Sequence, residues 1–170
     1  MMPIRSLVSE MMERSGQESL QNQYKMGSFD IQVLGKERTF CEKIMSLVRF
    51  SKTDTPIPDL RNKIRHVYDL HQMLLNPEIQ SFFHHSDFGH VLLKVGRDDV
   101  KSFKNNNDWL SEHPSTALIF EKALETWVQI RSEYLGNFRD LVTGILPPEN
   151  DIVNTLQKLA NRLKSVAWEI

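Results

Sequence analysis

The sequence predicts a mainly α-helical (α+β) fold, a helical bundle with one or two strands. Apolar residues recur every three or four positions over most of the chain, which is typical of helices with one buried face. Only residues 28–34 alternate apolar and polar side chains with the period of two that a half-buried strand shows. The length of 170 residues and the hydrophobic content of 40% suit one compact domain, or one domain with an attached helical hairpin, and not two independent cores.

The composition excludes several classes of protein. Lys and Arg number 21 against 22 Asp and Glu, so the whole chain has no electrostatic bias toward nucleic acid. A single cysteine, Cys41, excludes an intramolecular disulfide and a multi-cysteine zinc site. The first residues lack the apolar run of a signal peptide, and no segment has the roughly 20 apolar residues that cross a bilayer. We therefore expect a cytoplasmic protein without a membrane partner.

The N-terminal region predicts one helix and one strand. Pro3 opens an amphipathic segment that Gly16 is placed to end, so we expect a helix over residues 3–14. In residues 28–34, Phe29 and the apolar residues at alternate positions after it should form one buried face. A lone strand cannot form a sheet, so its partners should lie elsewhere in the molecule, in a second copy or in a missing piece of chain.

The next predicted helix covers residues 39–50. Thr39 and Glu42 have the spacing of a capping box, in which each side chain satisfies a free backbone N–H at a helix start. A loop that contains Pro56 and Pro58 should then interrupt the helical pattern.

The rest of the chain is predicted to be helical. One helix is expected over residues 60–75, and short helices follow between residues 77 and 103. The longest apolar pattern spans residues 115–144, with a possible break at Gly136. Pro148 is placed to start a final helix, whose apolar stripe consists of Ile152, Leu156, Leu159, Leu163 and Val166.

Arg65 and Asp69 are the first candidate site residues. They are four positions apart on a predicted helix, so their side chains can meet on one face. At about 100° per residue, Asp69 points almost opposite the apolar stripe that includes Val67, toward water or a cleft. The pair is therefore either part of a site or an ordinary solvated ion pair.

A local positive charge precedes Asp69. Residues 36–65 carry eight basic and four acidic residues, a net charge of +4, which makes a phosphate site possible. We expect Lys43 in the first helical turn after Thr39, where free N–H groups favour an anion. The alternative is that these residues border exposed helices. The candidates are Lys36, Arg38, Lys43 and Arg49.

Other reactive residues give weaker patterns. The spacing of His84, His85, Asp87 and His90 matches no common metal motif, so no metal site is predicted and a surface cluster is expected. Cys41 lacks the surroundings of a catalytic nucleophile and is expected to be a core thiol. The common nucleotide-binding loops and the G-x-S-x-G elbow do not occur in the sequence.

Two blocks of sequence resemble a known family. The stretch ERTFCEKIMSLVRFS (37–51), followed after a loop by KIRHVYDLHQML (63–74), is similar to the C-terminal half of AbiEii/AbiGii-type nucleotidyltransferase toxins. The family pattern R-T-F-x-E-K-I is matched by residues 38–44, and R-H-x-Y-D-L by residues 65–70. The strand at 28–34 and the segment ILPPENDI (145–152) also look like the family.

The resemblance implies transfer of a nucleotide from a nucleoside triphosphate to an acceptor such as RNA. It assigns Lys43 to the triphosphate and Asp69 to catalysis, while Arg65 would orient Asp69 or contact phosphate. An intact family member is expected to use Mg²⁺ and a nucleoside triphosphate. The toxin family also implies an antitoxin as a partner.

The sequence departs from the family in its metal-binding part. Gly27-Ser28 is the only G-S pair, and no D-x-D follows it, so the chain has no counterpart of the motif that holds Mg²⁺. We therefore expect a truncated C-terminal portion that is inactive alone and binds no cofactor by itself. Residues 1–52 would be the remnant of the nucleotidyltransferase core and 53–170 a helical C-terminal region, packed as one compact unit.

Two other functions remain open from the sequence. The chain could be a non-catalytic helical interaction module that binds the missing N-terminal half or another copy of itself as a homodimer. It could also bind RNA without catalysis through the basic segment 36–65.

Overall fold

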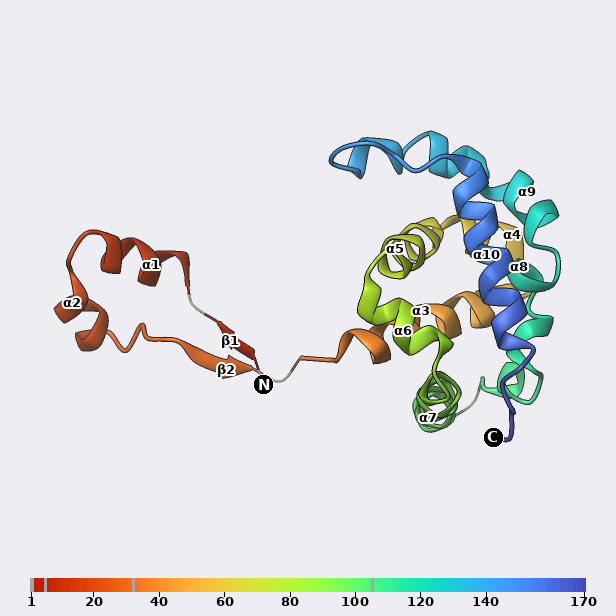
Figure 1. Cartoon of the computed structure of the whole chain (residues 1–170), viewed down its shortest axis with the longest axis horizontal. Helices are drawn as coiled ribbons and strands as arrows, with labels where there is room; N and C mark the ends of the chain where they lie inside the picture. Colours follow the sequence, from red (N-terminus) through yellow and green to blue (C-terminus); the bar gives the residue numbers. More distant parts are fainter. Residues whose placement is uncertain (1, 5, 32, 105) are drawn as a thin grey trace. The chain divides into compact units, whose positions relative to one another are not determined.

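A computed structural model describes residues 2–4, 6–31, 33–104 and 106–170, and it divides the chain into the units Met1–Gly35 and Lys36–Ile170 (Figure 1). In the described residues, ten α-helices and three short 3₁₀ helices accompany one two-stranded sheet. The predicted mainly α fold with one or two strands is therefore confirmed. No described helix is long and apolar enough to span a bilayer.

The first unit contains a two-stranded antiparallel sheet and two helices. Strand β1 (Met2–Ile4) pairs with β2 (Phe29–Ile31), and between them lie α1 (Leu7–Arg14) and α2 (Glu18–Gln23). The strand predicted at 28–34 is therefore shorter, and its partner includes residues 3 and 4, which were predicted to be the first residues of a helix. That prediction was wrong because Ser6 sets the start of α1: its hydroxyl accepts a hydrogen bond from the Ser9 N–H.

The described side chains of this strand's predicted buried face are exposed. Phe29 is 57% exposed and Val33, beyond the end of β2, is 52% exposed. A two-stranded ribbon buries little apolar surface unless another layer packs on it. Among the residues of this unit whose exposure is described, only Ser9 is buried, and the Gln21 side chain donates a hydrogen bond to its hydroxyl.

Helix α3 (Lys36–Ser51) lies at the centre of the second unit. It packs against α4 (Pro56–Arg61), α5 (Ile64–Leu74) and α7 (Asp87–Ser102), which cover different sides of it. The helix begins three residues before Thr39, so Thr39 lies in its first turn and not at its cap. Its buried residues are Phe40, Cys41, Ile44, Met45, Leu47, Val48 and Ser51.

The predicted helix 60–75 is two helices, α4 and α5, because residues 62 and 63 form a turn between them. Asn76 then caps α6 (Pro77–His84) by accepting hydrogen bonds from two backbone N–H groups. Helix α7 is continuous from Asp87, although its sequence predicted separate short helices.

The long helix predicted over residues 115–144 is interrupted. The 3₁₀ helices η1 (Asp108–Leu110) and η2 (Pro114–Thr116) precede α8 (Leu118–Glu121), and α9 covers Ala123–Leu135. The chain leaves helical geometry at Lys122, which was not predicted, and α9 ends before Gly136, as predicted.

The last helix, α10 (Glu149–Leu163), begins after Pro148, as predicted, and follows the 3₁₀ turn η3 (Arg139–Leu141). It packs against α5, α8 and α9 (Figure 1). All five residues of its predicted apolar stripe, including Val166 just beyond its end, are buried.

The division at Gly35 differs from the boundary at residue 52 that we drew from the sequence. Helix α3 lies N-terminal to residue 52, yet its buried face belongs to the same hydrophobic core as α5, α7 and α10. The assignment of residues 1–52 to a nucleotidyltransferase remnant stays a prediction.

Candidate functional site around Lys43 and Asp69

The structure brings two of the predicted site residues into direct contact. Lys43 on α3 and Asp69 on α5 form an ion pair, with 2.6 Å between Lys43 Nζ and Asp69 Oδ2. Their side chains are 21% and 22% exposed, so the pair is neither fully buried nor fully solvated. The prediction that Asp69 points away from the apolar stripe of α5 agrees with this contact, since Asp69 faces a polar side chain of α3.

Arg65 is a weaker partner of the same carboxylate. Its Nε lies 3.7 Å from Asp69 Oδ2, one helical turn away, and its side chain is 78% exposed. An exposed pair of this kind stabilises a helix by only about 0.2–0.5 kcal/mol. The Arg65 guanidinium is therefore free to move to another anion at little energetic cost.

His66 is a further member of this site that we did not predict as functional. Burial and, to a smaller extent, the charges of Lys43 and Lys63 lower the pKa of His66 to about 4, against the raising effect of Asp69. Its Nδ1 is buried without a hydrogen-bond partner in the described structure. His66 is consequently a neutral imidazole at neutral pH.

Cations outnumber anions around Asp69 and its neighbour His66, since Lys43 and Arg65 both pair with the Asp69 carboxylate. The charges of Lys43, Lys63 and Arg65 lower the pKa of His66, and among the described residues that affect it Asp69 is the one carboxylate. Lys63 also lies over the ring of Phe50, with Nζ 4.5 Å from the ring centroid. The described surroundings of His66 thus carry three positive charges and one negative charge, a balance that suits a phosphate ligand.

The four predicted phosphate-binding residues do not form one group. At about 100° per residue, Lys36 and Lys43 share one face of α3, whereas Arg38 and Arg49 share the opposite face. Lys36 pairs with Glu78 on α6, while Arg38 contacts Asp98 on α7 at 2.9 Å.

The single phosphate site predicted for these four residues is therefore wrong, and only Lys43 remains beside Asp69. Lys43 is also seven positions after the start of α3, so the N–H groups of the first turn do not reach it. Arg49 lies over the ring of Phe103, with its guanidinium carbon 4.4 Å from the centroid.

A metal site is not formed by the described residues. No group of three or more His, Cys, Asp or Glu side chains is placed to hold an ion in the part of the chain that the structure describes. In the histidine cluster, His85 contacts Asp87 at 3.2 Å, and both side chains are more than half exposed. The carboxylates that a Mg²⁺-dependent transferase requires are thus not assembled here.

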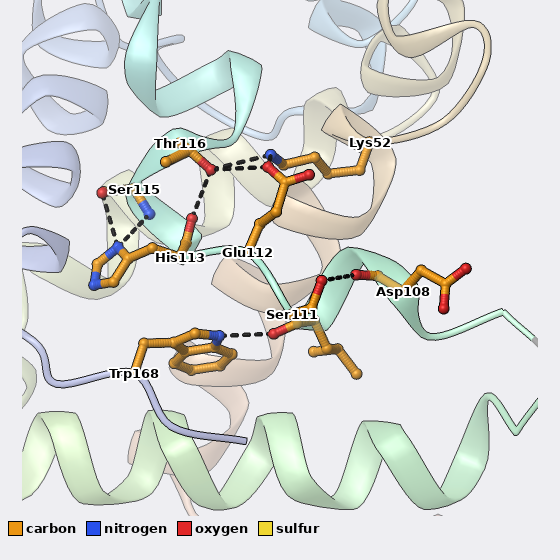
Figure 2. Close-up of polar contacts among 9 residues, drawn as sticks. Lys52, Asp108, Ser111, Glu112, His113, Ser115, Thr116 and Trp168 are labelled. Carbon is orange, nitrogen blue, oxygen red and sulfur yellow. Dashed lines mark hydrogen bonds and ion pairs between the residues drawn. The ribbon is translucent and has the colours of Figure 1, made fainter.

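A second polar cluster links the end of α3 to η2 (Figure 2). Lys52 pairs with Glu112 and donates a hydrogen bond of 3.0 Å to the Thr116 hydroxyl. Thr116 in turn donates to the His113 carbonyl, at 2.8 Å. These bonds hold the loop between η1 and η2 against the end of α3, so the role of this cluster is structural.

The nearby Ser115 and His113 resemble a nucleophile and base by distance alone. The Ser115 Oγ lies 2.8 Å from His113 Nδ1 (Figure 2). The second ring nitrogen lies 2.9 Å from the Val166 carbonyl. Since a carbonyl can only accept, Nε2 carries the proton and Nδ1 accepts. The same Nδ1 accepts from the Ser115 backbone N–H, at 3.2 Å, so His113 acts as the cap of η2.

Comparison with known families agrees with the motifs around this site. Residues 1–158 match the family model described as "Nucleotidyl transferase AbiEii toxin, Type IV TA system". The chain belongs to the AbiEii family. Neither the curated proteins nor the solved structures give a match.

Membership in the AbiEii family supports a nucleotidyltransferase-like function, and the family description places it in a toxin–antitoxin system. The matched residues include Lys43, Arg65, His66 and Asp69, all of which come from the two blocks that first suggested the family. His66 had a signal in the sequence, its place in the R-H-x-Y-D-L block, but its burial could be seen only in the folded chain.

Proposed function

We propose that Lys43, Asp69 and Arg65 form the triphosphate-facing part of a nucleotidyltransferase site. The reaction would transfer a nucleotide from a nucleoside triphosphate to an acceptor such as RNA, in the cytoplasm. The observation that carries this proposal is that two cations, Lys43 and Arg65, pair with one partly exposed carboxylate. The charge balance suits a triphosphate, which brings several negative charges to one place.

In this proposal Asp69 positions Lys43. The 2.6 Å ion pair holds the ammonium group of Lys43 on the α5 side of α3 before any ligand arrives. A phosphate oxygen could then take one of the three N–H donors of Lys43 while Asp69 keeps another. Arg65, which is mostly exposed, would supply a second cation at the rim.

The proposed site is incomplete for catalysis. Mg²⁺ would neutralise and orient the triphosphate in an intact family member. The described residues do not fit such an ion, so no catalytic step is assigned to them. We propose that the chain is inactive alone and that the metal-binding carboxylates come from a separate polypeptide or from a preceding segment. An antitoxin is the other expected partner.

Isothermal titration with GTP, CTP and UTP in the presence of Mg²⁺ tests this proposal. We expect one of them to bind and Lys43→Ala to weaken binding by about tenfold or more, the loss of one charge-assisted contact. Asp69→Asn should weaken it less, because it releases Lys43 without removing the cation. Lys94→Ala, an exposed lysine on α7, is the matched control and should bind like the natural protein.

Failure of all three triphosphates to bind would overturn the proposal. Equal losses in Lys43→Ala and Lys94→Ala would do the same, because binding would then depend on general positive charge and not on this site.

A second function, a helical interaction module or homodimer, is favoured by one surface. Leu124, Val128 and Leu135 are 57%, 55% and 46% exposed and lie within about 40° of one another around α9. Neighbouring apolar side chains that stay exposed often mark a contact with another protein. The opposite face of α9 is buried, so the helix needs no partner of its own to fold.

Light scattering tests whether this surface joins two copies of the chain. A dimer that Val128→Lys dissociates and that Gln129→Lys, on another side of α9, leaves intact would support self-association. A natural protein that is monomeric at high concentration would overturn the homodimer.

A further inference from the structure

A pocket of about 460 Å³ lies where α5, α6 and α10 meet, and the proposed nucleotide site does not use it. Leu74 at the end of α5 and Phe83 on α6 provide apolar side chains in its wall. Its volume is within the range of small-molecule pockets, about 300–1,000 Å³. Asp69 is not among the residues that line this pocket.

One cation in the pocket is held rigidly. The Arg162 Nε donates to the Phe83 carbonyl at 2.7 Å, and its Nη2 donates to the His85 carbonyl at 2.8 Å. Its guanidinium carbon also lies 5.0 Å from the ring centroid of Phe88. These contacts cap the C-terminus of α6, and they fix the guanidinium before a ligand binds.

Arg162 keeps donors for a ligand in spite of this structural role. Its third described hydrogen bond runs from Nη1 to the Ser165 hydroxyl, at 2.6 Å. A guanidinium has five N–H groups, so two remain after these three bonds.

The other polar residues of the pocket are donors without partners. Gln80, Lys158 and Asn161 have no side-chain hydrogen bond or ion pair among the described contacts, and His84 contacts only the ring of Phe83. None of the described residues that line this pocket carries a carboxylate. Lys158 and Arg162 therefore give it two positive charges that no acid of its own wall balances.

We propose that this pocket binds a small phosphomonoester, with the phosphate on Lys158 and Arg162 and an apolar body against Leu74 and Phe83. A phosphate dianion matches the two cations, and its oxygens can accept from the amide groups of Gln80 and Asn161. A carboxylate would leave one cation unbalanced, and inorganic phosphate would leave the apolar wall without a contact. This inference does not depend on the proposed function of Lys43 and Asp69.

Phenyl phosphate is a suitable probe, and NMR titration of the full chain reports where it binds. We expect saturable shifts of the side-chain amide signals of Gln80 and Asn161 at millimolar probe concentrations. Lys158→Gln should weaken binding by about tenfold, the loss of one charge-assisted contact. Lys164→Gln, directly after the end of α10 and outside this pocket, is the matched control and should change the affinity by less than about twofold.

Inorganic phosphate and benzoate, titrated in the same way, test the two parts of the ligand. Weaker binding of both than of phenyl phosphate would support a phosphomonoester with an apolar body. The proposal would be overturned if the amide signals did not move, if benzoate or inorganic phosphate bound as tightly, or if the two lysine variants lost affinity equally. Lys43→Ala should leave this titration unchanged, which separates it from the nucleotide test.

Discussion

Lys43 and Asp69 are 26 positions apart in the sequence, and their charged atoms lie 2.6 Å apart in the folded chain. Their contact joins α3 to α5, the two helices that carry the family motifs. Each side chain keeps about a fifth of its surface exposed, so the pair contributes to packing and remains open to a ligand.

A double-mutant cycle should measure this contact in the absence of nucleotide. For Lys43→Met and Asp69→Asn, we expect a coupling free energy of about 1 kcal/mol, more than most fully exposed ion pairs give. Urea denaturation of the natural protein, the two single variants and the double variant provides the value. A coupling indistinguishable from zero would mean that the two charges do not interact in solution.

His66 should make the folded state sensitive to acid. Burial lowers its pKa to about 4, below its ordinary value of 6.5, so between these values the unfolded chain binds more protons than the folded chain. The His66 contribution to stability is thus complete above about pH 6.5 and falls as the pH drops toward 4. Since the ring is only partly buried, we expect a loss of about 1–2 kcal/mol, which His66→Gln should reduce.

Urea denaturation at pH 7 and pH 5 provides the comparison for His66. His90→Gln is the control, because His90 is exposed on α7. An acid sensitivity that His66→Gln leaves unchanged would assign the effect to another group, such as His71, whose pKa burial also lowers.

Ser51→Ala should destabilise the second unit. The Ser51 hydroxyl donates to the Leu47 carbonyl and accepts from the Ile119 N–H, which lies in the buried first turn of α8. Without this hydroxyl the Ile119 N–H loses its side-chain acceptor, at a cost of about 1–3 kcal/mol.

Ser102→Ala is the matched control for Ser51→Ala. Ser102 makes the same bond to the carbonyl four residues earlier, but it is exposed and accepts no described backbone N–H. Thermal unfolding of both variants should show a clear decrease for Ser51→Ala and little change for Ser102→Ala. Equal decreases would contradict the role of the Ile119 contact.

Cys41 should be unreactive in the folded protein. Its side chain is fully buried, and burial raises the pKa of the thiol to about 12, so almost no thiolate forms at neutral pH. We expect a thiol-specific reagent to modify Cys41 only at the rate of unfolding and at once in denaturant. Rapid modification under native conditions would show that the α3 core opens without global unfolding.

Much of the helical structure could be predicted from apolar periodicity. The stripe of α10 is buried as predicted, because a single face of that helix carries all of its large apolar residues. In α9, the apolar pattern predicted over residues 115–144 covers two faces, of which only the one with Trp127 and Ile130 is buried. Periodicity cannot distinguish a face that packs from an apolar face that stays exposed.

The start of the chain shows a second limit. The helix was predicted to begin at Pro3, but residues 2–4 pair with residues 29–31, and the cap at Ser6 places the helix after them. Strand pairing depends on a partner distant in the sequence, which local patterns do not contain.

The candidate site was predicted in part. The family motifs and the charge count pointed to Lys43 and Asp69, and the folded chain brings them together. The same charge count also selected Arg38 and Arg49, which lie on the other side of α3. A count over a segment ignores the direction of each side chain, so it cannot separate two faces of one helix.

Helix α3 is packed on both sides, with Lys43 toward α5 and Arg38 toward α7. A one-residue insertion between Phe40 and Lys43 would turn every later residue of the helix by about 100°. This rotation would move the Lys43 side chain away from Asp69, and it would also turn Ile44 and Leu47 out of the core. Over evolutionary time this helix can therefore change by substitution, whereas a change in its length would remove the proposed site and the fold together.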